Sequence, residues 1–276
     1  MSEPSAALDV RAARRRFERA AAGYEGAARL EAEVGSRLRE RLDYVKIAPR
    51  RILDAGSGPG REVRALGARY RGAEIVALDY AHAMLPRPGR IERFLGRGVV
   101  PVCADLERLP LGADTVGLVW SNMTLHWLND PQAAFREFAR VLAPEGLLMF
   151  STLGPDTLKE LREALAPSRV HAFPDMHDLG DMLVAAGFSA PVMDMEVLAV
   201  SYPDAETVLH DLRVSGQTNA RADRARGLAG RGFRARLLHG LGGAPRITHE
   251  VVYGHAWKRA RAKPELKTVR VFKRIS

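Results

Sequence analysis

The segment 50–61, Arg-Arg-Ile-Leu-Asp-Ala-Gly-Ser-Gly-Pro-Gly-Arg, constrains the fold more than any other part of the chain. An apolar run ends in Asp54, then come Gly56, Gly58 and Gly60, and a helical pattern begins at once. This order of strand, glycine-rich turn and helix is typical of the first half of a βαβ unit that binds a nucleotide-like ligand. Glycine is needed there because only a residue without Cβ turns so tightly while a ligand touches its backbone.

The glycine spacing indicates which ligand the turn binds. A dinucleotide fingerprint has the form G-x-G-x-x-G, with a pyrophosphate at the helix N-terminus. Here the third glycine, Gly60, comes one residue too early for that pattern. Asp54 stands two residues before Gly56, where a carboxylate repels phosphate but attracts an ammonium group. We therefore expect S-adenosylmethionine as the cofactor, with a dinucleotide and a tight turn without ligand as the alternatives.

The composition is that of a folded protein. The chain has 276 residues, of which 46% are hydrophobic and 27% charged, which suits one large domain or a core with an elaboration. A single cysteine, Cys103, excludes an internal disulfide. The N-terminus lacks a secretory pattern, and no apolar run approaches the roughly 18 residues that span a bilayer. We expect a cytoplasmic protein without a membrane partner.

Basic residues outnumber acidic ones, 42 against 33, which gives a net charge of +9. This excess is either an ordinary solvated surface or a field that attracts an acidic partner. No zinc-ligand pair, RNP-type strand or basic zipper is visible, so we favour an acidic protein over a nucleic acid. The histidines lack the spacing of metal ligands, and no metal site is expected.

Two helices are expected before the glycine turn. Phe17, Ala21 and Tyr24 share one helical face, and apolar residues repeat every four positions from 30 to 42. Tyr24 lies at the glycine-containing break between these helices. It either packs as a core residue or closes over a ligand as part of a lid. Residues 1 to about 12 are expected to be unstructured.

Strands and helices alternate through the following hundred residues, which predicts a doubly wound parallel sheet. The fourth strand is almost continuously apolar, as a parallel strand covered on both faces should be. The expected parallel strands are 50–55, 73–79, 99–105, 115–122 and 147–151.

The remainder of the chain is expected to add two strands, 192–200 and 250–257, as an antiparallel pair. The result is a seven-stranded Rossmann-like α/β fold. Helices are expected at 156–165, 178–186, 205–214 and 231–241. We divide the chain into an N-terminal helical lid (1–47), an S-adenosylmethionine-binding core (48–202), a helical cap insertion (203–245), and a final strand with a basic tail (246–276).

Acidic residues follow the second and third strands, at the sheet edge where ligands bind in open α/β folds. Asp79 is placed to accept both ribose hydroxyls, with a helix N-cap as the alternative. Tyr80 and Met84 come next and are expected beside the cofactor. Asp105 and the backbone of Leu106 are placed to contact the adenine, although Asp105 is also a common turn residue.

The end of the fourth strand is where the transferred group should lie. Ser121 and Asn122 are expected on the cofactor side, and His126 and Trp127 on the acceptor side, with a structural role as the alternative for His126. Methyl transfer is an in-line displacement that mainly requires alignment. A carboxylate acceptor is already ionised and needs no general base. No acid–base pair stands out, so Tyr24, His126 and Trp127 are only alignment or lid candidates.

Longer motifs carry a resemblance to a known family. The chain has Asp54-x-Gly56-x-Gly58-x-Gly60 followed by Asp79 and Asp105, which resembles class I S-adenosylmethionine-dependent methyltransferases. More narrowly it resembles the malonyl-acyl-carrier-protein O-methyltransferases of biotin synthesis. The segments that carry this narrower resemblance are Phe17-x-x-Ala20-Ala21-x-x-Tyr24, Leu109-Pro110-Leu111, Trp120-Ser121-Asn122 through Trp127, 151–161 (Ser-Thr-Leu-Gly-Pro-Asp-Thr-Leu-Lys-Glu-Leu), 175–180, Ala186-Gly187-Phe188 and Tyr253-Gly254-His255-Ala256-Trp257.

The resemblance implies methyl esterification of the free carboxylate of a malonyl thioester, carried by an acidic acyl-carrier protein. It also implies that Tyr24, the 121–127 loop and a cap residue such as Arg213 shape the acceptor side, and we expect a monomer. His126 stands where the family often has Gln, and 213–217 differs from the usual Lys and Gly-Ala. The alternatives are a related arginine hydroxylase that acts on a respiratory-complex subunit, a small-molecule O-methyltransferase, and a non-catalytic cofactor-binding protein.

Overall fold

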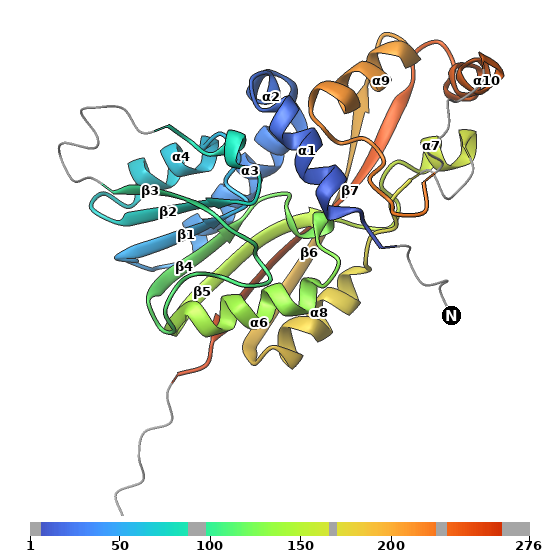
Figure 1. Cartoon of the computed structure of the whole chain (residues 1–276). Helices are drawn as coiled ribbons and strands as arrows, with labels where there is room; N and C mark the ends of the chain where they lie inside the picture. The colour runs from blue at the N-terminus through green and yellow to red at the C-terminus, as the bar shows by residue number, and fades with distance from the viewer. Residues whose placement is uncertain (1–6, 88–97, 166–169, 225–230, 261–276) are drawn as a thin grey trace, which may run out of the picture.

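A seven-stranded sheet forms the centre of the molecule, with strand order β3-β2-β1-β4-β5-β7-β6 (Figure 1). The computed structural model describes residues 7–87, 98–165, 170–224 and 231–260, except for the side chains of Arg231, Phe233, Arg234 and Arg236. The strands are β1 (Arg51–Ala55), β2 (Glu74–Asp79), β3 (Val99–Cys103), β4 (Val116–Ser121), β5 (Leu142–Leu153), β6 (Phe188–Ser201) and β7 (Arg246–Lys258).

The first five strands are parallel, and β7 runs antiparallel to both β5 and β6. The expected fold class, five parallel strands completed by an antiparallel pair, is therefore confirmed. The order reverses between β1 and β4, so a crevice opens at their carboxyl ends. The glycine turn after β1 lies at this switch point.

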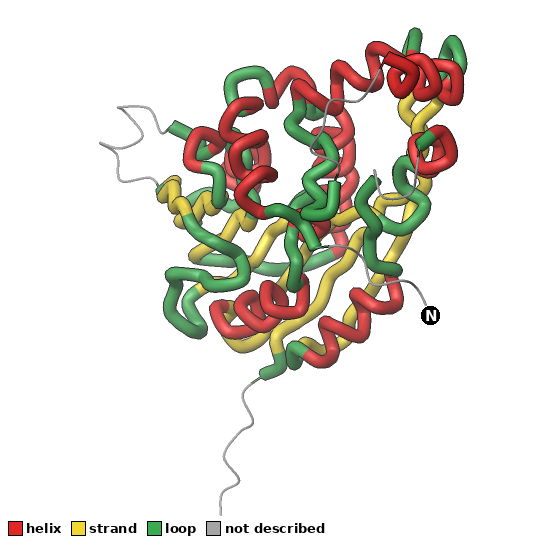
Figure 2. The backbone as a smooth tube through the Cα atoms, turned by 45° about the vertical axis from the view of Figure 1, so that its right-hand side comes forward, coloured by secondary structure: helices red, strands yellow, loops and turns green. Residues whose placement is uncertain are grey.

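Helices cover both faces of the sheet (Figure 2). On one face, α6 (Pro131–Val141) and α8 (Met176–Ala185) pack against a fully apolar cluster that includes Phe135 and Leu183. On the other, α3 (Arg29–Arg41) and α4 (Arg61–Arg69) pack against a cluster centred on Trp120. Because both faces are buried, the central strands are apolar at nearly every position, which is the pattern seen in the sequence.

Two groups of helices lie beyond the carboxyl ends of the parallel strands (Figure 1). The first is α1 (Val10–Ala20) with the short α2 (Tyr24–Ala27). The second is the insertion between β6 and β7, which forms α9 (Ala205–Val214) and α10 (Arg231–Leu241). These two helices share a small core with α7 (Lys159–Ala164). The described part of the chain also contains the short 3-10 turns η1 (Leu42–Tyr44), η2 (His82–Met84) and η3 (Leu125–Trp127).

Hydrogen bonds join α1 directly to the loop that follows α9. The Arg16 guanidinium donates to the carbonyl oxygen of Thr218 at 2.8 Å. The backbone N–H of Asp9 donates to the carbonyl oxygen of Ala220 at 2.7 Å, and the Asp9 carboxylate pairs with Arg224 at 3.0 Å. The N-terminal helices and the cap insertion therefore meet each other above the sheet edge.

The expectation that residues 1 to about 12 are unstructured is wrong for its last part. Helix α1 begins at Val10, because the side chain of Asp9 caps it by accepting from the N–H of Ala12 at 2.9 Å. Ala12 and Ala13 are buried. Residues 1–6 and the basic tail from 261 to 276 lie outside the described residues.

Several element boundaries also differ from those expected. Strand β3 ends at Cys103, so Asp105 lies in the turn beyond it. Strand β5 begins at Leu142, directly after α6, and accommodates the expected 144–146 turn as a bulge in which Glu145 has φ 62°. Helix α7 is shorter than expected because Leu158 before it has a left-handed conformation. Strands β6 and β7 extend beyond 192–200 and 250–257, because they pair with each other over nearly their whole length.

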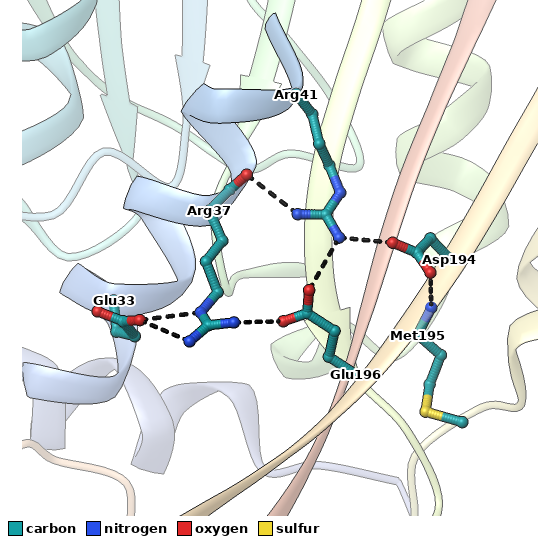
Figure 3. Close-up of polar contacts among 6 residues, drawn as sticks. All are labelled: Glu33, Arg37, Arg41, Asp194, Met195 and Glu196. Carbon is teal, nitrogen blue, oxygen red and sulfur yellow. Dashed lines mark hydrogen bonds and ion pairs between the residues drawn. The ribbon is translucent and has the colours of Figure 1, made fainter.

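An ion-pair network joins α3 to the edge strand β6 (Figure 3). Arg41 contacts Asp194 at 2.5 Å and Glu196 at 3.3 Å, and Arg37 contacts Glu196 at 3.0 Å. The Arg41 guanidinium also lies over the ring of Tyr253, 3.8 Å from its centroid. Shared carboxylates and a cation–π contact make such a network stronger than isolated surface pairs.

Arg41→Met is expected to lower the free energy of unfolding by about 1 kcal/mol at low salt. Most of that loss should disappear at 1 M salt because partly exposed ion pairs are screened. Urea denaturation at both salt concentrations measures this loss in the free energy of unfolding. Arg51→Met, which breaks the single Arg51–Glu74 surface pair, is the matched control and should cost less. Equal losses in the two variants would contradict a cooperative network.

Candidate active site

The glycine turn joins β1 to α4 in the conformation that its residues require. Gly56, Gly58 and Gly60 have φ values of 84°, 50° and 85°, the left-handed region that other residues avoid. The N–H groups of Gly56 and Ser57 both donate to the carbonyl oxygen of Leu78, at 2.8 and 2.9 Å. A Cβ on Gly56 would lie 2.2 Å from the hydroxyl of Thr124. The turn is thus fixed against both β2 and the loop after β4.

Asp79 holds the same turn from the end of β2. One carboxylate oxygen accepts from the N–H of Gly58 at 3.1 Å, and the other accepts from the N–H of Ala81 at 2.8 Å. Each oxygen has two lone pairs, so each can accept one further hydrogen bond. Burial raises the pKa of Asp79 to about 6, and the side chain is 8% exposed. The site therefore offers two adjacent acceptor positions on a rigid carboxylate.

Asp54 is a buried carboxyl group with one oxygen that accepts no hydrogen bond from the described residues. It is 1% exposed, and its Oδ2 atom has no hydrogen-bond partner among the described residues. Burial, followed by the nearby charge of Glu62, raises the pKa of Asp54 well above its usual value. Glu62 itself is paired with Arg39 at 2.6 Å. A buried carboxylate without a partner is costly, and a bound ammonium group would supply the missing charge.

A first cavity of about 870 Å³, open at its mouth, lies over the glycine turn and the ends of β2, β3 and β4. Phe17, Tyr24 and Trp127 contribute rings to its wall, and Phe17 contacts Trp127 edge to face at 5.0 Å. The cofactor residues expected from the sequence that line it are Gly56, Gly58, Asp79, Tyr80, Met84, Asp105, Leu106 and Asn122. Asp54 lines a smaller cavity, the Asp54 cavity, that shares Tyr24, Gly56, Gly58 and Asn122 with the first.

A second cavity of about 1150 Å³ lies between the ends of the strands and the cap. His126, Trp127 and Arg213 line it, as expected for the acceptor side. Its other walls are mainly leucines of α7, α9 and α10, together with His171 and His249. Trp127 lines both cavities, so its ring marks the boundary where they meet.

Two expected site residues lie elsewhere than the sequence suggested. Ser121 is fully buried, lines neither cavity, and donates from its hydroxyl to the carbonyl oxygen of Ala55 at 2.9 Å. Its position at a strand end is explained by this bond between β4 and β1. Tyr24 was expected on the acceptor side as part of a lid, but it lines the first cavity and not the second. Its ring lies close to Gly58, on the cofactor side.

Sequence reasoning missed several residues of the two cavities. Val10 lines the first cavity although it falls in the stretch expected to be unstructured. Thr124, which packs on Gly56, and the histidines His171 and His249 were also not selected. A helix-cap signal at Asp9 could have revealed the ordered start of α1, whereas no local pattern marks the two histidines.

Comparisons with known proteins agree on one family. Residues 53–150 match the Methyltransferase domain family. A malonyl-acyl-carrier-protein O-methyltransferase from Gallionella capsiferriformans is 49% identical and covers 92% of each chain. One from Methylovorus is 50% identical over 91% of this chain and 90% of its own. The chain belongs to the malonyl-acyl-carrier-protein O-methyltransferase family. Methyltransferases of this family depend on S-adenosylmethionine.

Solved structures show the fold that this family shares with more distant proteins. The YcgJ protein from Bacillus subtilis has a TM-score of 0.58 at 18% identity, covering 80% of this chain and 97% of its own. The cyclase SpnF has a TM-score of 0.52 at 20% identity, with 83% and 81% coverage. At such identity the likeness establishes the fold alone, and activity must be argued from the site.

The residues present in this family member fit S-adenosylmethionine. The unpartnered Oδ2 of Asp54 suits an ammonium group, and the free lone pairs of Asp79 suit two ribose hydroxyls. Within the described ranges no cluster of His, Cys, Asp or Glu is arranged to hold a metal. Nor is any helix in those ranges both long and apolar enough to cross a bilayer.

Affinity for S-adenosylmethionine is expected to fall about tenfold between pH 7 and pH 5. Hydroxyl donors bind the ionised carboxylate, and burial raises the pKa of Asp79 to about 6. The competent, ionised form therefore predominates above pH 6, is half present near that value, and is lost as the pH falls through it. Burial lowers the pKa of His126 to about 3 and of His171 to about 4, so neither titrates in this window.

Titration calorimetry at constant ionic strength measures this pH dependence, with circular dichroism at each pH to show that the chain stays folded. Protonation of Asp54 would act in the same direction, because an ionised Asp54 attracts the ammonium group. An affinity that stays constant down to pH 5 would contradict a role for ionised carboxylates in binding.

Proposed function

We propose that this chain methylates the free carboxylate of a malonyl thioester carried by an acyl-carrier protein, the early pimeloyl step of biotin synthesis. The observation that supports this choice is the second cavity. Among the described residues that line it there is one arginine, Arg213, and there is no carboxylate. An anionic acceptor is therefore attracted, and it meets the first cavity at Trp127.

The proposed cofactor contacts follow from the first cavity and the Asp54 cavity. Asp54 faces the ammonium group, Asp79 accepts from the ribose hydroxyls, and Asp105 with the backbone of Leu106 contacts the adenine. Tyr24 covers the glycine turn as part of the N-terminal lid. The remaining proposed contacts are Gly56, Gly58, Tyr80, Met84 and Asn122. We assign Ser121 no cofactor contact, because its hydroxyl bonds to the carbonyl oxygen of Ala55 and so holds the end of β4 against β1.

The chemistry requires alignment more than acid–base groups. Bound S-adenosylmethionine supplies a methyl group on a positively charged sulfur, which leaves as a neutral thioether when the acceptor oxygen bonds to the methyl carbon. The acceptor carboxylate is ionised at neutral pH, so no protein group has to remove a proton. Burial lowers the pKa of His126 to about 3, which keeps this neighbouring side chain neutral and unable to protonate the acceptor. Trp127 and the leucines around it exclude water.

Arg213 is proposed to hold the carboxylate oxygen that is not methylated. It lies near the end of α9 and lines the second cavity. Arg213→Gln is expected to raise KM for the malonyl thioester roughly tenfold, because a charge-assisted hydrogen bond is lost. Affinity for S-adenosylmethionine should not change. Arg246→Gln, which replaces an exposed arginine outside both cavities, is the control. A KM unchanged by the Arg213 variant would contradict the assignment.

The cap insertion is the proposed docking surface for the acidic carrier protein. In the cap insertion, 203–245, seven arginines outnumber four acidic residues, Asp204, Glu206, Asp211 and Asp223. A basic segment that includes Arg213 of the second cavity would steer an acidic partner so that its acyl group enters there. We propose that the chain works as a monomer in the cytoplasm. The arginines of this segment are Arg213, Arg221, Arg224, Arg226, Arg231, Arg234 and Arg236.

A methyl-transfer assay tests the proposal. The protein is incubated with methyl-labelled S-adenosylmethionine and with malonyl-carrier protein, malonyl-coenzyme A, or free malonate. Base-labile label on the malonyl-carrier protein is the expected result, because methyl esters hydrolyse in alkali. Cofactor binding without any methyl ester on a malonyl thioester would contradict the proposed function. Label on a small hydroxyl compound instead would favour a small-molecule O-methyltransferase, whereas an arginine hydroxylase would transfer no methyl label to any of these acceptors.

A further inference from the structure

Three histidines line the second cavity, and burial keeps all of them neutral. They are His126 in η3, His171 in the segment before α8, and His249 in β7. Burial lowers the pKa of His126 to about 3 and the pKa values of His171 and His249 to about 4. At neutral pH these side chains are therefore hydrogen-bonding groups without charge, in a cavity whose lining cation is Arg213.

The protein uses the ring nitrogens of the first two histidines. Nε2 of His171 accepts from the N–H of Ala220 at 2.9 Å, so its proton is on Nδ1. Nδ1 of His126 lies 3.4 Å from the hydroxyl of Thr152. His249 differs, because its buried Nδ1 has no hydrogen-bond partner within the described part of the chain. A neutral imidazole has one donor and one acceptor nitrogen, so His249 keeps unused capacity.

His249 is also held on a rigid part of the sheet. Its neighbour Thr248 bonds to Glu160 through both its N–H and its hydroxyl. On the other side, Thr157 and the backbone of Glu250 exchange two hydrogen bonds of 3.1 Å. Side chains alternate along a strand, so the imidazole of His249 projects from the face opposite the side chains of Thr248 and Glu250.

The position of His249 brings its ring to the wall between two cavities. It lies two residues before Val251, which pairs with Leu153 at the carboxyl end of β5. The side chain is 6% exposed and lines the second cavity together with an adjoining cavity near Tyr202. Leu212 and Gln217 also line both. A molecule that enters either cavity therefore comes close to the ring of His249.

From this geometry we infer that His249 determines acceptor specificity by donating a hydrogen bond to the thioester carbonyl of the acceptor. The inference rests on the proposed function. A malonyl thioester carries two polar groups, a charged carboxylate and an uncharged carbonyl separated by one methylene. The cavity offers a matching pair, the cationic Arg213 and the neutral His249. A neutral donor suits a carbonyl because neither group has to lose a full charge from water.

This assignment predicts that the enzyme distinguishes a malonyl thioester from an analogue that lacks the thioester carbonyl. A carboxyethyl thioether has a CH₂ group in place of the carbonyl and keeps the carboxylate and the chain length. Without the carbonyl, the imidazole has no acceptor and stays unpaired in a buried site. The wild type should therefore prefer the malonyl thioester over the thioether analogue roughly 10- to 100-fold in kcat/KM.

The experiment compares both acceptors, each attached to the carrier protein, with the wild type, His249→Phe, His249→Asn and His255→Phe. His255 is a half-buried histidine on the same strand that lines neither cavity, so it is the matched control. We expect His249→Phe to lower kcat/KM for the malonyl thioester roughly 10- to 100-fold and to change the value for the thioether less than about threefold. His249→Asn keeps an N–H donor and should restore part of the preference, and His255→Phe should behave as the wild type.

Calorimetric titration with S-adenosylmethionine accompanies each variant, and an affinity within about twofold of the wild type shows an intact cofactor site. The assignment is overturned if His249→Phe keeps the full preference for the malonyl thioester over the thioether. It is also overturned if the variant lowers kcat/KM equally for both acceptors while cofactor binding is intact. Were the phenylalanine variant to misfold, the asparagine variant alone decides: a preference for the malonyl thioester as large as that of the wild type overturns the assignment. If the wild type methylates neither acceptor, the proposed function itself is contradicted.

Discussion

An Asp79→Ala variant is expected to bind S-adenosylmethionine on the order of 100- to 1,000-fold more weakly than the wild type. Two hydroxyl groups would lose a charged acceptor, and each such bond contributes about 1.5–3 kcal/mol. The alanine also releases the N–H groups of Gly58 and Ala81, which the carboxylate holds at 3.1 and 2.8 Å. Titration calorimetry with the folded variant measures the loss.

Glu74→Ala is the matched control for this variant. Glu74 is a carboxylate at the opposite end of β2, where it pairs with Arg51 at 2.8 Å and lines neither cavity. The Glu74→Ala variant should bind the cofactor with the affinity of the wild type. Asp79→Asn keeps one acceptor oxygen, so its affinity for the cofactor should lie between that of Asp79→Ala and that of the wild type. Tight binding by Asp79→Ala would refute the ribose role of this carboxylate.

Gly56→Ala is expected to abolish measurable cofactor binding and to lower the free energy of unfolding by about 2–4 kcal/mol. Two causes add at this position. The residue has φ 84°, which strains any residue with a Cβ, and that Cβ would lie 2.2 Å from the hydroxyl of Thr124. Chemical denaturation measures the stability, and equilibrium dialysis with labelled cofactor measures the binding.

Two other glycines separate these causes. Gly58 also has positive φ, 50°, but its added Cβ would meet Met84 and Tyr24 only at 3.7 and 3.9 Å. Gly58→Ala should therefore cost only about 1 kcal/mol, from backbone strain. Gly67 lies inside α4 with ordinary space around it, so Gly67→Ala should be neutral or stabilising by up to about 1 kcal/mol. If all three variants are equally stable, the close packing of the turn on Thr124 is not what fixes its shape.

The fold was predictable because its signals are local. Apolar strands, a glycine turn and acidic strand ends each occupy a few consecutive residues, and the rule that parallel strands bind ligands at their carboxyl ends brings them together. Asp79 and Asp105, separated by a whole βα unit, line one cavity as that rule requires. His126, Trp127 and Arg213, which were expected on the acceptor side, line a second cavity together, and Arg213 was expected there only from the resemblance to the family.

What could not be predicted depends on contacts between distant segments. Ser121 stands at a strand end like a ligand-binding residue, and only its bond to the carbonyl oxygen of Ala55 in β1 reveals a structural role. His249 lies 123 positions after His126 (249 − 126 = 123), and no pattern in the sequence indicates that the sheet brings both to one cavity. The bulge that lets β5 continue through 144–146 likewise arises from pairing with β4 and not from local propensity.

The bonds from Arg16 to Thr218 and from Asp9 to Ala220 and Arg224 have a consequence for turnover. One partner of each bond belongs to α1 or to its N-cap residue, beside the first cavity, and the other to the loop after α9, beside the second cavity. These two segments cannot separate while the bonds remain. We therefore expect exchange of spent cofactor and departure of the ester to depend on one opening event that sets the rate of both.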